Sequence, residues 1–564
     1  MLGNIGEVFL QLVVPLSPSW PRIWGDMWNY TPEVFSDDEL EVLSRHFTNA
    51  DKPVFALINL PEVVKGALFA RYSRSPKSLR RLFLDEFYHA DNDAYESASA
   101  VGVARAEGLY ERMLADYGDD SVAQLGGVHL ACEQASNILT KVLERGRIMA
   151  YLEQSTRYIP YNKPLADGNY RYLVPNEIAG AGLEQDYRSE MDSLFAGYLE
   201  IFDEVEARLR ATTTKDPDDS DSVFNSSIRA VALDTARGIL PASVLSNVGI
   251  FASAQAYEAL ILRMRASELN EVRQYGELIR AELDKVIPAF LTRVDRPDRG
   301  GIWVDYLASR NTVPAGTPRS VSSGGRSIDD GEDVTVRLIS FDPAGERKIA
   351  ASVLFSQFPV SMEEAIETAN SLSDGELRML IANYVGNRQN RRHKPGRAFE
   401  ETGYLFEIEC DYGAFRDLQR HRMLSIEWQV LGTSLGYVVP ELVHDFGLKE
   451  KFQNIMDRSR GFHERLQQAV GPKVGAYAVP MAYRVRFTMN LNAREALHMI
   501  ELRTSPQGHS SYRKVAQRMY SCIDSVANHR SVAAAMSFVD FGNYRLGRLS
   551  SLRQEESKNQ RISS

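Results

Sequence analysis

The chain has 564 residues, of which 44% are hydrophobic and 25% are charged, and its formal net charge at pH 7 is −10. These values are typical of an ordinary soluble globular protein and exclude a disordered chain, while the length favours two or more domains. The acidic balance argues against a nucleic-acid partner, because binding to a phosphate backbone depends on clustered positive charge, but local arginines can still bind a small anion.

The spacing of special residues excludes several further classes. Cys132, Cys410 and Cys522 lie far apart and form no CxxC pair, so neither a disulfide framework nor a zinc cluster is expected, and a reducing cytoplasm is the predicted compartment. The ten histidines show no HExxH or comparable spacing, which gives no support for a metal site. No stretch offers about 18 uninterrupted apolar residues, so no membrane partner is expected. The first 20 residues have no basic leader and no clear cleavage signature.

Local patterns in the first half predict one long helix and two irregular segments. Apolar residues at mostly helical spacing between about 120 and 143 predict a helix that carries Arg145 and Arg147 at its end. The acidic, helix-poor stretch 211–223 is expected to be an exposed loop. The stretch from about 295 to 333 is rich in Gly, Ser and Pro, as expected of a connector between folded units.

The second half predicts a strand followed at once by a short helix. The segment TGYLFEIECDYG (402–413) alternates in polarity as a strand does. The segment AFRDLQRHR (414–422) predicts a helix that ends at Arg420–Arg422. After about Leu546 the chain is polar, so we expect a tail that frays.

Several landmarks occur twice in the same order. ARGILP (236–241) precedes Arg263 and Arg273, and YAVP (477–480) precedes Arg503 and Arg513, each pair of arginines being ten residues apart. We interpret the chain as an internal duplication of an α+β unit, a twisted sheet flanked by helices. The predicted divisions are an N-terminal extension at 1–58, a first copy at 59–295, a linker at 296–335, a second copy at 336–545 and a flexible tail at 546–564.

Two segments resemble damaged copies of one motif, and the damage falls on different positions. Segment 145–155 begins Arg-Gly-Arg and ends at Ser155, whereas segment 420–430 begins Arg-His-Arg and ends at Val430. If the halves meet in space, each supplies what the other lacks, which suggests one composite nucleotide site.

Each segment taken alone has a simpler interpretation. Arg-His-Arg suits an anionic ligand, but basic residues also favour the C-terminal end of any helix. The segment EQSTRY (153–158) offers a hydroxyl and a guanidinium for phosphate and an amide for a base, but it can also be a turn leading into Pro160. The basic segment RQNRRHKPGR (388–397) attracts folate glutamates or phosphate, or is a solvated loop.

Together the two segments resemble the flavin-dependent thymidylate synthases, whose signature is Arg-His-Arg, seven residues and then Ser, with the longer form RHRxxSxNExSxRY. The first segment keeps Arg145, Arg147, Glu153, Ser155, Arg157 and Tyr158, and it departs at Gly146, Ala150 and Leu152. The second keeps Arg420, His421, Arg422 and Ser425, and it departs at Glu427 and Trp428. ARGILP is similar to the family's ARxxLP segment, and Asn492-Ala493-Arg494 to its Asn-Ala-Arg turn. The match covers most of both halves but is thin between these motifs.

The resemblance implies roles for individual residues. Cofactor contacts are expected from Arg420, His421, Arg422 and Arg503, and from the first-copy positions Arg145, Arg147 and Arg263. Substrate contacts are expected from Glu153, Gln154, Ser155, Thr156, Arg157, Asp417, Arg420 and Arg494. Catalytic roles are expected for Ser155, Arg273 and Arg513, with Arg273 beside the uracil. Family members are homotetramers with sites built from neighbouring subunits, so we expect a homodimer that forms a pseudo-tetramer.

The resemblance also implies the chemistry. The expected reaction is FAD-dependent reductive methylation of dUMP, or a close pyrimidine nucleotide, to dTMP, with NADPH and methylenetetrahydrofolate as co-substrates. An arginine near the base stabilises the developing anion without a thiol nucleophile. The alternative is a non-catalytic or regulatory flavin- or nucleotide-binding protein, which the departures at Gly146 and Leu152, and Glu401 in place of a family histidine, favour.

Overall fold

The computed structural model describes residues 33–51, 55–72, 75, 77–88, 124–157, 159–166, 168–311, 333–544 and 546–563. Tyr158, the start of the predicted helix at 120–123, the first 32 residues of the predicted extension and residues 312–332 of the predicted linker lie outside these ranges. The chain divides into two compact units, Met1–Gly126 and Gly127–Ser564. The predicted first copy (59–295) therefore spans parts of both units.

The shorter unit is helical in its described part. It contains α1 (Asp37–His46), α2 (Glu62–Tyr72), α3 (Leu79–Leu82) and the π-helical turn η1 (Phe83–Phe87). Ser36 and Glu39 form a reciprocal capping box that begins α1. No residue of the predicted site belongs to this unit.

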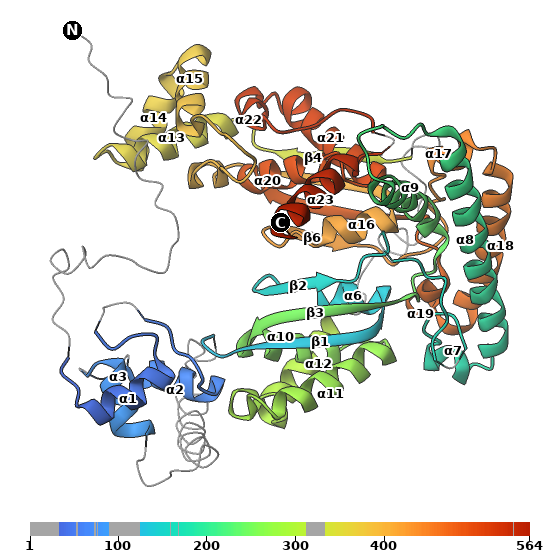
Figure 1. Ribbon diagram of the computed structural model, residues 1–564. Helices are drawn as coiled ribbons and strands as arrows, with labels where there is room; N and C mark the ends of the chain where they lie inside the picture. Colours follow the sequence, from blue (N-terminus) through green and yellow to red (C-terminus); the bar gives the residue numbers. More distant parts are fainter. Residues whose placement is uncertain are drawn as a thin grey trace. The chain divides into compact units, whose positions relative to one another are not determined.

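The longer unit begins with a three-stranded antiparallel sheet of order β1-β3-β2 (Figure 1). The strands are β1 (Gly127–Ser136), β2 (Met149–Glu153) and β3 (Leu245–Ser253), and the short helix α6 (Asn137–Leu143) joins β1 to β2. The predicted long helix is therefore wrong over 127–136 and correct from Asn137. Ladder pairing with β3, which lies far along the chain, overrides the local helical spacing there.

A four-stranded antiparallel sheet of order β4-β5-β7-β6 follows. Its strands are β4 (Thr335–Phe341), β5 (Gly403–Asp411), β6 (Ser425–Trp428) and β7 (Arg484–Asn492). The helix α16 (Tyr412–Gln419) joins β5 to β6, and the side chain of Asp411 accepts from the Ala414 amide to cap it. The strand and the short helix predicted for 402–422 are thus confirmed.

Helices cover both sheets and connect their strands. In the first half they are α7 (Asn176–Gly180), α8 (Glu184–Thr212), α9 (Asp221–Ala236), η2 (Arg237–Ile239), α10 (Ala254–Arg265), α11 (Asn270–Asp284), η3 (Pro288–Leu291), η4 (Pro297–Gly301) and α12 (Ile302–Arg310). In the second half they are α13 (Gly345–Gln357), α14 (Met362–Ser371), α15 (Asp374–Val385), η6 (Arg397–Glu400), α17 (Glu441–Asp445), α18 (Lys449–Val470), α19 (Pro472–Gly475), η7 (Ala476–Ala478), α20 (Ala493–Arg503), α21 (Ser510–Ser521), η8 (Cys522–Val526), α22 (Arg530–Ala535) and α23 (Leu549–Ser563). Among the described residues, no helix combines the length and apolar character needed to cross a membrane.

The same order of elements occurs twice in this unit. The first series is β1, α6, β2, α8, η2, β3, α10 and α11, and the second is β5, α16, β6, α18, η7, β7, α20 and α21. Each series pairs its short and long strands in the same way, β2 with β3 and β6 with β7. The duplicated landmarks of the sequence therefore correspond to duplicated structural positions.

The two series cross at a reciprocal backbone contact. The Ala242 amide donates to the Val479 carbonyl at 2.9 Å, and the Met481 amide donates to the Leu240 carbonyl at 3.0 Å. Pro241 and Pro480 face each other at the centre of the crossing. Exchange of equivalent bonds is the mark of a local two-fold relation.

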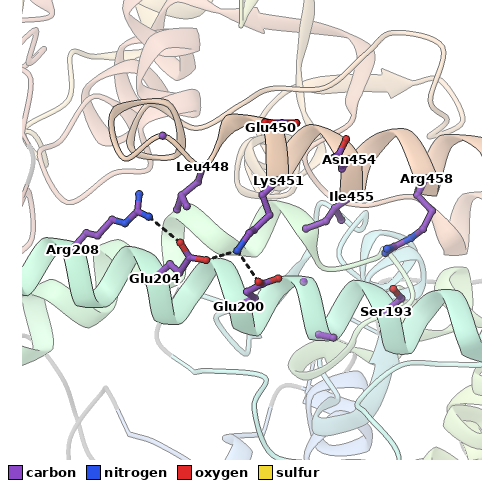
Figure 2. A pocket seen from close by; sticks show the side chains of 13 residues that line it. Ser193, Glu200, Glu204, Arg208, Leu448, Glu450, Lys451, Asn454, Ile455 and Arg458 are labelled. Carbon is purple, nitrogen blue, oxygen red and sulfur yellow. Dashed lines mark hydrogen bonds and ion pairs between the residues drawn. The ribbon is translucent and has the colours of Figure 1, made fainter.

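The long helices α8 and α18 run side by side and border a groove of about 660 Å³ (Figure 2). Lys451 of α18 pairs with Glu204 and, at 2.6 Å, with Glu200 of α8. A Cβ atom at Gly197 would lie 2.8 Å from Cδ1 of Ile455, so this glycine permits the close approach of the helices. The groove holds surface ion pairs and none of the predicted site residues.

Two segments predicted to be irregular are helical. Residues 297–310 of the predicted linker form η4 and α12, and Leu307 is buried. The predicted frayed tail forms α23, whose Arg553 pairs with Asp219 at 2.5 Å, and Glu556 accepts from the Ser220 hydroxyl at 2.6 Å. These contacts with the start of α9 stabilise α23. This helix is polar, so its sequence shows no apolar spacing from which a helix could be predicted.

Candidate functional site

The two incomplete motif segments contact each other. Glu153, at the end of β2, is buried and accepts a hydrogen bond of 2.7 Å from Nη2 of Arg416 on α16. Nη1 of Arg420 lies 3.9 Å from the second carboxylate oxygen of Glu153. Ser155 follows two residues later, so its Cα lies within about 7 Å of that of Glu153. The serine of the first half and the arginines of the second half therefore share one region.

A second carboxylate, that of Asp417, lies among arginines of both halves. It forms an ion pair with Arg420, and its oxygens lie 3.9 Å from Nη1 of Arg503 and 3.8 Å from Nη1 of Arg237. Arg237 belongs to the ARGILP segment of the first half, whereas the other residues belong to the second half.

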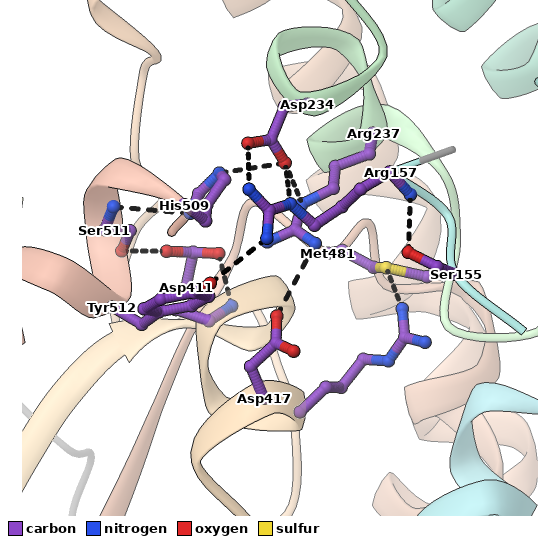
Figure 3. A network of polar contacts seen from close by, with 12 residues as sticks. Ser155, Arg157, Asp234, Arg237, Asp411, Asp417, Met481, His509, Ser511 and Tyr512 are labelled. Atoms are coloured by element: carbon purple, nitrogen blue, oxygen red, sulfur yellow. Dashed lines mark hydrogen bonds and ion pairs between the residues drawn. The ribbon is translucent and has the colours of Figure 1, made fainter. Parts of the chain in front are cut away.

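Asp234 connects this network to Arg157 of the EQSTRY segment in the first half (Figure 3). Arg157 donates to both oxygens of Asp234, at 2.8 and 2.9 Å, and Nε of Arg237 lies 3.5 Å away. Arg157 also donates to the Tyr512 hydroxyl at 3.1 Å and to the Gln507 carbonyl at 2.9 Å. The arginine of EQSTRY is therefore held by α9 of its own half and by α21 of the other.

The network has more positive than negative charge. Its six basic side chains are Lys141, Arg157, Arg237, Arg416, Arg420 and Arg503, and its four carboxylates are Glu144, Glu153, Asp234 and Asp417. Burial raises the pKa of Glu153, but Arg416, Lys141 and Arg420 outweigh it and lower that pKa to about 2. The pKa of Asp417 is likewise held well below its usual range, since Arg420, Arg503 and Arg237 outweigh burial. Burial raises the pKa of Glu144, and the nearby charge of Lys141 opposes this shift.

The histidine of the Arg-His-Arg segment is fixed in one tautomer. Nε of Arg503 donates to Nε2 of His421 at 3.0 Å, and arginine cannot accept, so Nε2 carries no proton. The proton of the neutral ring is therefore on Nδ1, which donates to Glu495 at 3.1 Å. Burial, with Arg503 and Arg420 nearby, holds the pKa of His421 well below its usual value. Both ring nitrogens are thus committed within the protein.

The same geometry bears on the metal question. His421, Glu495 and His498 bring three ligand atoms within 4.8 Å of one another. Nε2 of His421 accepts from Arg503 and Nδ1 then holds the ring proton, so neither ring nitrogen has a lone pair available to an ion. A metal ion would need Arg503 to leave, so this cluster is better described as a hydrogen-bonded support for His421.

The Arg-Gly-Arg segment of the first half contacts β6 of the second. Nη2 of Arg145 pairs with Glu427 at 2.8 Å, and that of Arg147 donates to the Ser425 hydroxyl at 2.9 Å. A Cβ atom at Gly146 would lie 2.5 Å from Sδ of Met149 and 2.6 Å from the Tyr151 hydroxyl. A side chain at this position would therefore require Met149 and Tyr151 to move.

The two predicted catalytic arginines have different surroundings. Arg513 donates to the Thr504 carbonyl at 2.8 Å and to Asp540 at 3.1 Å, and it lines a cavity of about 360 Å³ together with Arg157 and Asp234. Arg273 donates instead to the carbonyls of Ser267 and Glu268, both at 2.7 Å. Within the described part of the chain, the structure does not bring Arg273 into contact with the network.

The remaining predicted residues lie at the margins of the network. Gln154 accepts from Arg171 at 3.4 Å, and Thr156 is buried. Arg494 donates to the Pro395 carbonyl at 2.8 Å. Arg263 is half-buried, and burial lowers its pKa. Arg422 is exposed.

Sequence reasoning did not select Arg237, Arg416, Lys141 and Asp234 as site residues. Two signals were available. Arg416 lies four residues before Arg420 and so shares its helix face, and Arg237 is the arginine of the repeated ARGILP landmark. Asp234 lies three residues before Arg237 on the preceding helical turn, but the sequence gives no sign that it faces Arg157.

Comparisons with known proteins include one family model that matches two separate stretches of the chain. The family model described as thymidylate synthase complementing protein matches residues 68–289 and 337–527. A UPF0159 protein of Chlamydia muridarum (strain MoPn / Nigg) is 37% identical over 522 residues, which are 91% of this chain and 97% of that protein. The UPF0159 protein Ta1429 of Thermoplasma acidophilum is 31% identical over 512 residues, 86% of this chain and 97% of that protein.

Two further matches are partial. A flavin-dependent thymidylate synthase of Mycobacterium sp. (strain KMS) is 29% identical over 183 residues, 32% of this chain and 67% of that protein. The crystal structure of a UMP/dUMP methylase, PolB, from Streptomyces cacaoi bound with 5-Br dUMP is 19% identical and covers 36% of this chain and 95% of that chain. Its TM-score of 0.30 supports no statement about a shared fold.

Proposed function

Because this chain belongs to the thymidylate synthase complementing protein family, in a form that carries the family unit twice, we propose that it catalyses FAD-dependent reductive methylation of dUMP or a close pyrimidine nucleotide to dTMP. NADPH and methylenetetrahydrofolate are the co-substrates in this proposal. The acting assembly is a homodimer of duplicated chains in a reducing, cytoplasmic environment.

One observation carries the proposal: the motif residues that survive in each half lie together. Glu153 of the first half meets Arg416 and Arg420 of the second within a buried network. Random decay of two copies has no reason to preserve opposite parts of one site. The composite arrangement is what a working site requires.

The network suits the phosphate of a nucleotide. The residues that its ion pairs join include more basic groups than carboxylates, and a phosphate monoester carries up to two negative charges near pH 7. Nη2 of Arg237 is buried and has no hydrogen-bond partner, although the guanidinium lies within 4 Å of Asp417 and Asp234. An unsatisfied buried donor is costly, and a phosphate oxygen would satisfy it. Ser155 supplies a hydroxyl in the same region.

The pyrimidine end of the nucleotide would occupy the cavity beside Arg157 and Arg513. A guanidinium there keeps its charge at all working pH values and stabilises an anion that develops on the base. Removal of one such donor lowers a rate by about two to three decades. The chain does not need a cysteine nucleophile for this role.

The surroundings of the Arg-His-Arg segment also fit a flavin nucleotide. Arg422 is exposed and, among the described contacts, forms no ion pair, so it is available to an anionic cofactor group. His421 orients Arg503 through its unprotonated Nε2. FAD, when bound, supplies the hydride chemistry that amino-acid side chains lack.

A second candidate function has one specific observation in its favour. The carboxylate of Asp417 lies among Arg420, Arg503 and Arg237 and competes with a substrate phosphate for them. A protein that binds flavin or nucleotide without turnover, in a regulatory role, would tolerate such competition.

Rescue of a thymidine-requiring strain tests the proposal. The chain should restore growth without thymidine, and the purified protein should show yellow flavin absorbance. Ser155→Ala and Arg420→Ala should each abolish rescue although they lie in different halves. Arg188→Ala, which removes a surface pair with Glu184 on α8 and touches no residue of the network, should leave rescue intact. Near-normal rescue by either site variant would exclude a shared site, and a flavin-loaded, soluble protein that fails to rescue would favour the regulatory alternative.

A further inference from the structure

The basic loop, residues 388–397, is ordered by its own hydrogen bonds and by a buried ion pair. Its first residue, Arg388, forms a buried ion pair with Glu501 at 2.6 Å. Nε of Arg388 also donates to the His393 carbonyl at 2.5 Å, which closes the loop on itself. The Arg392 amide donates to the Asn390 side chain at 2.9 Å. These contacts hold the loop backbone in one conformation.

The basic loop lies beside the Arg-His-Arg segment. Arg494 donates to the Pro395 carbonyl at 2.8 Å, and the next residue on α20, Glu495, accepts the hydrogen bond of His421. Lys394 is one residue from Pro395, so its charge lies near the same end of α20. In agreement, Lys394 contributes to lowering the pKa of His421, after the larger effects of burial, Arg503 and Arg420.

Three cations of the basic loop are close in sequence and have no acidic partner. Arg391, Arg392 and Lys394 fall within four residues, and no ion pair to any of them occurs among the described residues. Arg397 differs, because its guanidinium lies 3.2 Å from Glu400. Like charges that lie close together repel one another even in water, so a fixed backbone that carries three cations within four residues favours an anionic ligand.

We propose that Arg391, Arg392 and Lys394 bind the flexible polyanionic tail of a ligand whose other end lies at the Arg-His-Arg segment. The inference rests on the proposed function, which supplies two ligands with such tails. One is a folate that carries a chain of γ-linked glutamates, and the other is the diphosphate of the flavin nucleotide. The loop selects the tail and not the reacting ring, so it governs affinity and not the chemical step.

The test compares ligands with and without the tail. The full-length triple variant Arg391→Gln/Arg392→Gln/Lys394→Gln is titrated with tetrahydrofolate carrying one or five glutamates, and with riboflavin and FAD. We expect the wild type to bind one tailed ligand at least tenfold more tightly than its tailless form. The triple variant should lose about tenfold of that preference, while affinity for the tailless ligand changes less than twofold. The ligand pair, folate or flavin, whose ratio of tailed to tailless affinity falls in the triple variant identifies the tail that the loop binds.

Arg397→Gln is the matched control, because it removes a cation of the same loop that already has an acidic partner. It should leave both ratios unchanged. Equal thermal midpoints of wild type and triple variant exclude a folding defect, as expected for side chains outside the core. The proposal would be overturned if both tailed-to-tailless affinity ratios were unchanged in the triple variant. It would also be overturned if the wild type bound the tailed and tailless forms equally well.

Turnover separates this proposal from the proposed function. If the enzyme is active but binds tailed and tailless ligands equally well, only the proposed role of the basic loop is contradicted. If the chain prefers the tailed ligand but neither rescues growth nor forms dTMP, only the proposed methylation reaction is contradicted. In both cases the two measurements are made on the same preparation.

Discussion

Glu153→Gln is the sharpest perturbation of the contact between the halves. Glutamine has nearly the size of glutamate but no charge, so packing at the end of β2 is retained. Arg416 and Lys141, both buried, then lose the carboxylate that lies 2.7 and 3.4 Å from their nitrogens. The variant therefore isolates the electrostatic part of the contact.

The expected loss of stability follows from the pKa of Glu153. The difference between its ordinary value of 4.5 and the value of about 2 in the folded protein corresponds to about 3 kcal/mol. Independently, removal of one partner from a buried ion pair costs about 3–5 kcal/mol. We therefore expect the free energy of unfolding to fall by about 3 kcal/mol at pH 7.

The pH dependence of this loss has a definite sign. A carboxyl group whose pKa is lowered by folding stabilises the protein fully at pH values above its unfolded pKa. That stabilisation declines as the pH falls from about 4.5 toward 2. The difference between wild type and Glu153→Gln should thus be constant from pH 7 to pH 5.5 and narrow below about pH 4.5.

Urea unfolding followed by tryptophan fluorescence measures the difference, since Trp428 lies at the contact beside Arg145. Glu427→Gln is the matched control, because Glu427 also joins the halves through Arg145 but the two side chains are 76% and 44% exposed. An exposed pair contributes about 0–1 kcal/mol. If Glu153→Gln costs no more than Glu427→Gln, or if its cost persists unchanged below pH 4, the reasoning is refuted.

Three further outcomes are expected. Arg237→Gln should weaken dUMP binding by at least tenfold in calorimetric titration and leave deoxyuridine binding within twofold, because only the phosphate uses the buried Nη2; equal losses for both ligands would contradict this role. Nitrogen NMR of His421 should show a proton on Nδ1 and none on Nε2, with a titration midpoint well below 6.5, because burial and the neighbouring arginines lower its pKa; a titration midpoint near 6.5 would count against the buried tautomer. Gly146→His should lower the free energy of unfolding by about 1–3 kcal/mol without creating a second flavin site, because Met149 and Tyr151 occupy the space; unchanged stability in urea unfolding would show that they yield easily.

The parts of the fold that local chemistry controls could be predicted. The strand and helix at 402–422 follow from alternation and from the capping residue Asp411, and both are present as β5 and α16. The family resemblance carried by the two motif segments is confirmed by the family model, which matches the chain in two separate stretches. Residue identity at fixed spacing is sufficient for these inferences.

The parts controlled by distant contacts could not be predicted. The strand β1 has apolar residues at helical spacing and becomes a strand because it pairs with β3. The helix α23 is polar and depends on an ion pair with Asp219, far away in the sequence. Arg273 and Arg513 share one position in the repeat, but among the described contacts Arg513 forms an ion pair with Asp540 and Arg273 forms none. Charge partners, unlike periodicity, leave no trace in the local sequence.

The reciprocal crossing at Pro241 and Pro480 has a consequence for protein concentration. When two separate subunits build a site, dilution below their dissociation constant dismantles it. Here the crossing and the ion pairs of Glu153 join segments of one polypeptide, so their encounter is intramolecular and its probability does not depend on the number of molecules present. The contact between the two halves should therefore survive at nanomolar protein, where a site shared between chains would be lost.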